Sequence, residues 1–323
     1  VARMAQDDAL SDVDLRRYCF LDTETTGLSG GTGTMAFVVG LGYFKAAAEA
    51  SDQFCVRQYF LRDPGDEPAM VDSLADFLSG FDALASFNGR AFDVPIIENR
   101  LILARISPPT AGLPHLDLLL AARRLWRYCL SSCALGTIER DVLGVQREQA
   151  DVPSGVIPQL YRDYLRTGDA REMKRVLYHN EIDILSLVTL AARLGRVLMD
   201  PWQGAGLVGA EFYGLARWYH SDDRPQETER AYRAALARED LPPDLRARTL
   251  RDLAYLLKRS GRQREAFAYW QQLALESVDD VLGHVELAKY FEWHVKHSAL
   301  AAGWTRAALT VVERWPVGRR REQ

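Results

Sequence analysis

The chain has 323 residues, of which 48% are hydrophobic and 26% charged, and its formal net charge at pH 7 is −4. This composition excludes a disordered chain, and the length exceeds one ordinary hydrophobic core, so two domains are expected. The weakly negative charge gives no global basic field for a polyanionic partner, although cations bound to an acidic cluster would offset part of it.

No run of eighteen apolar residues is present, so we expect no membrane-spanning segment. Residues 1–14 lack the apolar core of a signal peptide. Because the chain begins with Val1, we expect its natural start to lie upstream or to use an alternative start codon. The four cysteines are scattered without a CxxC pair, which favours reduced thiols and a cytoplasmic location.

The first 200 residues alternate strand-like and helix-like patterns. Apolar runs predict three strands, at residues 18–22, 34–44 and 54–61. Leu74, Phe77 and Leu78 share one face of a helix predicted over 70–81. A short strand at 83–87 and a helix at 94–104 follow, and further helices are predicted at 116–126, 135–143 and 171–194. This order predicts an α/β domain with a mixed sheet flanked by helices.

The first candidate site residues are Asp22 and Glu24, at the end of the first strand. Residues two apart on a strand point to the same face, and two carboxylates placed in this way repel each other unless a cation lies between them. The alternative is a solvated strand end followed by a Thr-Gly turn.

Two more acids follow other predicted elements. Asp93 comes after a strand and an Asn88-Gly89 turn, where its alternative role is to cap a helix beginning at Val94. Asp183 lies on a late helix four residues after His179, so the two share a face, which could equally be a solvated polar stripe.

These acids together suit two-metal phosphodiester chemistry. Such chemistry needs several hard oxygen ligands that converge from different elements on two cations about 4 Å apart. Mg²⁺ and Mn²⁺ prefer carboxylate and water ligands. We therefore expect two Mg²⁺ or Mn²⁺ ions, with His179 close enough to deprotonate or orient an attacking water.

The three motifs resemble those of the DEDD superfamily of ribonuclease H-like 3′–5′ exonucleases. Residues 22–27 (DTETTG) match its first motif, residues 88–93 (NGRAFD) match its second motif, NxxxFD, and Asp183 in YHNEIDILSL matches its third. Within that superfamily the chain is similar to the bacterial YprB-like proteins, in which a tetratricopeptide-type region follows the nuclease domain. The similarity covers residues 16–195 and implies that Asp22, Glu24, Asp93 and Asp183 bind the metal ions.

The third motif departs from the family pattern. In the family, this motif has a Tyr four residues before the last acid or a His five residues before it, whereas this chain has His179 at four and Tyr178 at five. We favour His179 as the residue that assists the water, because the ordinary pKa of histidine suits proton transfer near neutrality. Tyr178 is a candidate for substrate contact, or its ring faces the core.

Other candidate substrate contacts lie within the first two motifs. The resemblance places the terminal nucleotide against residues that follow the first acids, and for these residues a simple turn is the alternative. Asn88 either contacts the substrate or caps its own turn, and the ring of Phe92 is either a core group or a stacking platform for a base. The complete set is Thr25, Thr26, Gly27, Asn88, Phe92 and Tyr178.

The second half of the chain contains a helical repeat. Three sets of positions recur with offsets of 38 and 34 residues, namely Leu215, Leu253 and Leu287, then Tyr232, Trp270 and Trp304, then Ala235, Leu273 and Ala307. We therefore predict an N-terminal extension at 1–15, the nuclease domain at 16–198 and tetratricopeptide-like repeats at 199–323. The repeats would bind a protein partner or the substrate strand, or simply support the nuclease domain.

The sequence thus predicts a metal-dependent hydrolase that acts as a 3′–5′ exonuclease on single-stranded DNA or RNA. Two alternatives stay open. One is an endonuclease of the ribonuclease H type, and the other is a non-catalytic tetratricopeptide scaffold whose nuclease domain is vestigial.

Overall fold

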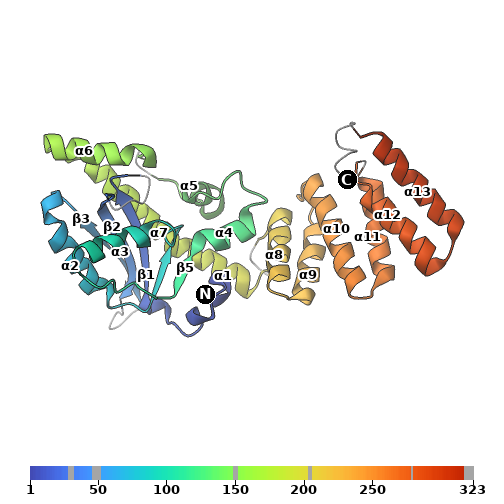
Figure 1. Ribbon diagram of the computed structural model, residues 1–323, viewed down its shortest axis with the longest axis horizontal. Coiled ribbons are helices and arrows are strands. Elements are labelled where there is room, and N and C mark those ends of the chain that lie inside the picture. Colours follow the sequence, from blue (N-terminus) through green and yellow to red (C-terminus); the bar gives the residue numbers. More distant parts are fainter. Residues whose placement is uncertain (28–32, 46–51, 148–151, 203–205, 278, 316–323) are drawn as a thin grey trace. The chain divides into compact units, whose positions relative to one another are not determined.

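The protein forms two compact units in the computed structural model, which describes residues 1–27, 33–45, 52–147, 152–202, 206–277 and 279–315. The first unit comprises the described residues of 1–123 and 130–205. The second comprises 124–129 and the described residues from 206 onward. Figure 1 shows a sheet flanked by helices in the first unit and helices alone in the second.

The first unit is built on a five-stranded sheet with the order β3-β2-β1-β4-β5. The pairs β1–β2 and β2–β3 are antiparallel, whereas β4 runs parallel to β1 and β5 runs parallel to β4. The predicted mixed sheet is confirmed. The strands are β1 Tyr18–Thr25, β2 Ala36–Lys45, β3 Gln53–Phe60, β4 Ala83–Ser86 and β5 His115–Asp117.

The described residues up to 199 form seven α-helices, and short 3-10 and π turns connect several of them. Residues 139–143 form one such π turn, directly after α5. The helices are α1 Ala2–Ala5, α2 Glu67–Leu78, α3 Asp93–Leu103, α4 Leu118–Trp126, α5 Leu135–Ile138, α6 Ile157–Thr167 and α7 Arg171–Met199.

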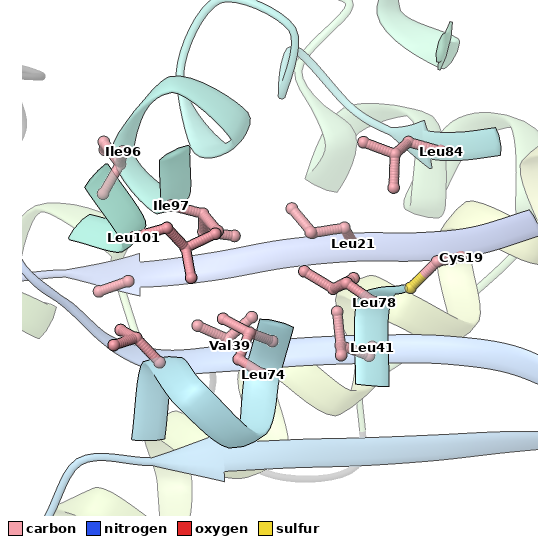
Figure 2. Close-up of a cluster of buried hydrophobic side chains, with 12 residues drawn as sticks. Cys19, Leu21, Val39, Leu41, Leu74, Leu78, Leu84, Ile96, Ile97 and Leu101 are labelled. Atoms are coloured by element: carbon pink, nitrogen blue, oxygen red, sulfur yellow. The ribbon is translucent and has the colours of Figure 1, made fainter. Parts of the chain in front are cut away.

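One face of the sheet packs against α2 and α3. Alternate residues of β1, Cys19 and Leu21, are fully buried there together with Val39 and Leu41 of β2 (Figure 2). Helix α2 covers them with Leu74 and Leu78, and α3 contributes Ile96, Ile97 and Leu101. Because side chains alternate along a strand, Phe20, Asp22 and Glu24 of β1 point to the opposite face of the sheet from Cys19 and Leu21.

The opposite face carries α7, which contacts β1, β2 and β3. Two glycines of β2 allow this close contact. A Cβ atom on Gly42 would lie 2.6 Å from Ile184 Cγ2 of α7, and one on Gly40 would lie 2.3 Å from Asn180 Oδ1. Strand glycines often mark such a close approach. They allow polar groups of α7 to come near the backbone and acids of β1.

One predicted helix begins as a strand, and one observed helix was not predicted. The helix predicted over 116–126 is a short strand, β5, followed by α4, because Asp117 Oδ1 accepts the backbone N–H of Leu119 and caps the start of the helix. Helix α6 was not predicted, although Ile157 and Tyr161 are four residues apart and Pro158 occupies the first turn.

The N-terminal residues pack within the first unit, where Met4 and Leu10 are buried.

The second unit consists of helices that contact one another in pairs, α8 with α9, α10 with α11 and α12 with α13. The three sets of repeated positions fall on these pairs in register, the leucines on the first helix and the other two sets on the second. A tetratricopeptide assignment stays a prediction. The helices are α8 Gly209–Ser221, α9 Pro225–Leu236, α10 Pro243–Arg259, α11 Gln263–Glu276, α12 Leu282–Lys289 and α13 Ser298–Glu313.

Residues 124–129 pack with α8 in the second unit. Trp126 Nε1 donates a hydrogen bond of 2.6 Å to Glu211 Oε1, which satisfies two buried polar groups at once. Gly214 makes close backbone contact possible here, because a Cβ atom on it would lie 2.3 Å from the carbonyl oxygen of Leu125.

Among the described residues, no helix combines the length and the apolar character that a bilayer crossing requires. The expected cytoplasmic location stays a prediction.

Candidate functional site

Strand β1 and helix α7 bring acidic residues together on one face of the sheet. His179 Nε2 lies 3.3 Å from Asp183 Oδ2 and 3.8 Å from Glu24 Oε1, and all three side chains are buried. Their potential ligand atoms lie within 4.8 Å of one another. Residues from the first and third motifs, about 155 positions apart in sequence, therefore meet at one point.

A cavity of about 150 Å³ opens beside this cluster. Both acids of β1 reach it, as does the acid of α7, and the segment at the start of α6 forms another wall. The lining residues are Asp22, Thr23, Glu24, Thr25, Phe92, Ser154, Pro158, His179 and Asp183. Three of the four predicted acids thus line a single cavity.

Asp93 is buried at the start of α3, next to β1. The helix begins at Asp93 itself, with Phe92 before it and no side-chain cap, so the alternative reading of Asp93 as the N-cap is wrong. Asp93 Oδ1 accepts a hydrogen bond of 2.5 Å from Thr23 Oγ1, whose side chain points to the α3 side of β1. Asp93 does not line the cavity, but its charge is close enough to raise the pKa of Asp22.

The electrostatics of the cluster favour protonated acids or a bound cation. Burial raises the pKa of Asp22 well above its ordinary value, and the charges of Asp183, Asp93 and Glu24 raise it further. Burial also raises the pKa of Asp93 to about 6, against hydrogen bonds from Thr23 that lower it. The pKa of Asp183 is likewise raised by burial, although the neighbouring His179 and Arg147 oppose the shift. Near neutral pH, ionising these carboxylates costs free energy, and a bound divalent cation would reduce that cost.

Asn180, which the sequence analysis missed, holds Asp22 in place. Its Nδ2 donates a 2.8 Å hydrogen bond to Asp22 Oδ2, and its Oδ1 accepts a 2.9 Å hydrogen bond from Gln58 Nε2. Asp22, Gly40 and Gln58 lie side by side on β1, β2 and β3. The amide of Asn180 lies over Gly40 and connects the side chains of Asp22 and Gln58 on either side of it. The available signal was Gly40-x-Gly42 within an apolar strand, which marks a close approach of another element.

A second missed group is the pair formed by the half-buried Arg147 and the buried Glu139. Arg147 donates hydrogen bonds to Asp183 Oδ1 and to His179 Nδ1, and Glu139 holds the guanidinium from the other side. Neither residue belongs to a motif, and only the fold places them beside α7.

The candidate substrate contacts are distributed unevenly around the site. Thr25 and Phe92 line the cavity, whereas Tyr178 is partly buried and is not among the described lining residues. The hydroxyl of Thr26 accepts the backbone N–H of Met35, and Thr25 Oγ1 donates to the carbonyl of Gly27, as expected for the turn alternative.

Asn88 is exposed and has a left-handed backbone with φ of 66°. Its N–H donates to Asp117 Oδ1, so the backbone of Asn88 is fixed by the same carboxylate that caps α4. The side chain of Asn88 stays a candidate for substrate contact.

The donor set fits hard divalent cations. Asp22, Glu24 and Asp183 offer carboxylate oxygens to one cavity, which are the ligands that Mg²⁺ and Mn²⁺ prefer. Arg147 forms an ion pair with Asp183, and His179 lies beside Asp183 and Glu24. A dication bound by the three carboxylates would offset the negative charge that they bring to one cavity.

Comparisons with known proteins agree with this geometry. The sequence profile of the RNase_H superfamily matches residues 19–195, which is more than half of the chain. The protein YprB of Bacillus subtilis (strain 168) is 34% identical over 282 residues, covering 84% of this chain. The chain spans 64% of the length of that relative.

The structure of the family B DNA polymerase from the archaeon Pyrobaculum calidifontis is also similar, with a TM-score of 0.40 and 13% identity. The match covers 68% of this chain and 29% of the polymerase.

The role of Asn180 is tested by Asn180→Asp. This change puts a carboxylate where an N–H donor now contacts Asp22, so we expect the free energy of unfolding to fall by about 1–3 kcal/mol at pH 7. Near pH 4 the loss should be smaller, because a protonated carboxyl can still donate to Asp22. Urea unfolding at both pH values measures the difference, and an equal loss at both would contradict the proposed contact.

The raised pKa of Asp93 predicts a pH-dependent stability. Between about pH 4 and pH 6 the folded state binds more protons than the unfolded chain, so this group lowers the free energy of unfolding as the pH rises. A shift from 3.8 to about 6 corresponds to about 3 kcal/mol. With chelator present, the free energy of unfolding of the wild type should therefore fall by about 3 kcal/mol more than that of Asp93→Asn between pH 4 and pH 7. Parallel stability curves for the two proteins would refute the shift.

Proposed function

The chain belongs to the RNase_H superfamily, and we propose that it is a divalent-metal-dependent nuclease, acting as a 3′–5′ exonuclease on single-stranded DNA or RNA. The observation that carries this proposal is the meeting of Asp22, Glu24 and Asp183 with His179 around one cavity. Several carboxylates that repel one another at one cavity are a costly arrangement in a purely structural role, and burial and mutual repulsion raise the pKa of Asp22.

In this proposal Asp22, Glu24, Asp93 and Asp183 bind two Mg²⁺ or Mn²⁺ ions. When bound, such ions activate an attacking water and stabilise the leaving oxygen. Asn180 keeps one oxygen of Asp22 aligned, and Thr23 does the same for Asp93. A hydrogen bond donated to a carboxylate that also binds a metal ion orients that carboxylate and increases metal affinity.

Two observations support the assignment of the residue that assists the water. His179 lines the cavity and lies between Glu24 and Asp183, whereas Tyr178 is not among the described lining residues. We therefore assign His179 to the reacting water, which it would deprotonate or orient. Tyr178 is left with a structural or peripheral substrate role.

The 3′–5′ exonuclease subtype is supported by the order and spacing of the three acidic motifs, which resemble the DEDD pattern. An endonuclease of the ribonuclease H type is the alternative within the same superfamily. Thr25 and Phe92 line the cavity beside the acids, and in this proposal they contact a terminal nucleotide.

For the second unit we propose tetratricopeptide-type repeats that present a surface to a protein partner or to the substrate strand. The three contacting helix pairs and the in-register repeat positions support this assignment. A purely supporting role for these helices, or a non-catalytic scaffold with a vestigial nuclease domain, is the competing account.

The activity is tested by incubating the protein with end-labelled single- and double-stranded DNA and RNA, with Mn²⁺, Mg²⁺ or chelator. We expect shortening from the 3′ end of a single strand, dependent on the metal. Asp22→Asn should lower the rate by at least about 100-fold, since it removes a ligand charge while an amide oxygen can still accept from Asn180.

The matched control is Asp72→Asn, which removes an exposed acid of α2 and should leave the rate unchanged. Internal cleavage without end preference would favour the endonuclease. Full activity of Asp22→Asn, or no metal-dependent cleavage of any substrate, would overturn the proposal.

A further inference from the structure

Arg147 contacts both α7 residues of the site from outside the cavity. Its Nη1 lies 2.8 Å from His179 Nδ1, and its Nη2 donates to Asp183 Oδ1. Arg147 is not among the described residues that line the cavity, so it approaches the ring and the carboxylate from behind.

The contact between Arg147 and His179 determines where the ring carries its proton. A guanidinium has only N–H donors and no acceptor, so the ring nitrogen that it contacts must accept. A neutral imidazole has one N–H and one lone pair. Because Nδ1 supplies the lone pair to Arg147, the N–H is at Nε2.

The surroundings of Nε2 agree with this tautomer. Nε2 lies 3.3 Å from Asp183 Oδ2 and 3.8 Å from Glu24 Oε1, and both of these carboxylate oxygens are acceptors. With the opposite tautomer, two N–H groups would face each other at Nδ1 and a lone pair would face two carboxylates at Nε2. Both contacts would then be repulsive.

We propose that Arg147 is a positioning residue that fixes His179 as a hydrogen-bond donor toward the cavity. His179 then orients an oxygen of the attacking water or of the scissile phosphate through Nε2–H. Of the two roles proposed above for His179, deprotonating or orienting the water, this leaves orienting, because Nε2 carries the hydrogen and the only lone pair points at Arg147. The catalytic part of this inference depends on the proposed nuclease function, whereas the tautomer does not.

The same arrangement gives the histidine and the carboxylates of the cluster different roles. His179, Glu24 and Asp183 lie close enough to form a mixed nitrogen and oxygen metal site. A nitrogen that carries a hydrogen has no lone pair for a metal ion. The cation is therefore left to the carboxylates of the cluster.

Arg147 is itself held firmly. Its Nη2 lies 2.8 Å and its Nε 3.1 Å from Glu139 Oε2, and the same Nη2 lies 2.9 Å from Oε1. Glu139 is buried and also accepts a hydrogen bond of 2.6 Å from Ser186 Oγ of α7. A guanidinium held in this way keeps its orientation, since releasing it would leave Glu139 as a buried unpaired charge.

The tautomer can be measured directly in the metal-free protein. Two-bond proton–nitrogen spectra of ¹⁵N-labelled protein at about pH 8 distinguish a ring N–H from an unprotonated ring nitrogen, at a pH where an ordinary histidine is neutral. His179→Gln identifies the His179 signals among the six histidines. We expect Nε2 to be protonated and Nδ1 unprotonated. A wild-type spectrum with the N–H at Nδ1 would overturn the proposal.

Two variants of similar length test the part played by Arg147. Arg147→Met removes every donor, so the Nδ1 signal should move toward the protonated position as the tautomers mix, whereas Arg147→Lys should keep the wild-type pattern. Arg147→Met together with Glu139→Gln avoids the buried unpaired carboxylate and should show the same mixing. Arg166→Met, which removes an exposed guanidinium of α6, should change nothing.

An unchanged His179 spectrum in both variants that lack Arg147 would refute its positioning role. The measurement contains no metal ion and no substrate. An absence of nuclease activity would therefore contradict the proposed function without affecting the tautomer of His179. A different tautomer would contradict the present inference without affecting the proposed function.

Discussion

Mutual repulsion among buried carboxylates is the constraint around which the first unit is arranged. Strand β1 directs Asp22 and Glu24 to the face covered by α7, and α7 returns Asp183 to the same cavity. Each of these charges raises the cost of ionising the others. The fold tolerates this crowding because hydrogen-bond donors surround it and because divalent cations can neutralise it.

The supporting residues act from several directions. Asn180 donates to Asp22 from above Gly40, Thr23 donates to Asp93 from the α3 side of β1, and Arg147 donates to Asp183 from outside the cavity lining. Each donor takes one carboxylate oxygen and leaves the other for a different partner. Gly40 is part of this arrangement, since any larger residue would displace the amide of Asn180.

The sequence allowed the architecture and the acidic motifs to be predicted because both depend on local patterns. Alternation along β1 placed Asp22 and Glu24 on one face, and helical spacing placed His179 beside Asp183. Strand β5 was missed because three residues are too few to show alternation.

Arg147 and Glu139 could not have been predicted, because they lie outside the acidic motifs and become neighbours of α7 only through the tertiary fold. The sequence alone also could not show which ring nitrogen of His179 donates a hydrogen bond. It depends on a contact across 32 positions of sequence rather than on the motif itself.

The account is tested most directly by a crystal structure of the protein grown with Mn²⁺, in which anomalous scattering locates the metal. We predict anomalous peaks in the cavity, bound by carboxylate oxygens of Asp22, Glu24 and Asp183, and their loss in Asp22→Asn. A cavity without any peak at saturating Mn²⁺, with the acids hydrogen-bonded only to protein groups, would contradict the claim that this cluster exists to hold cations.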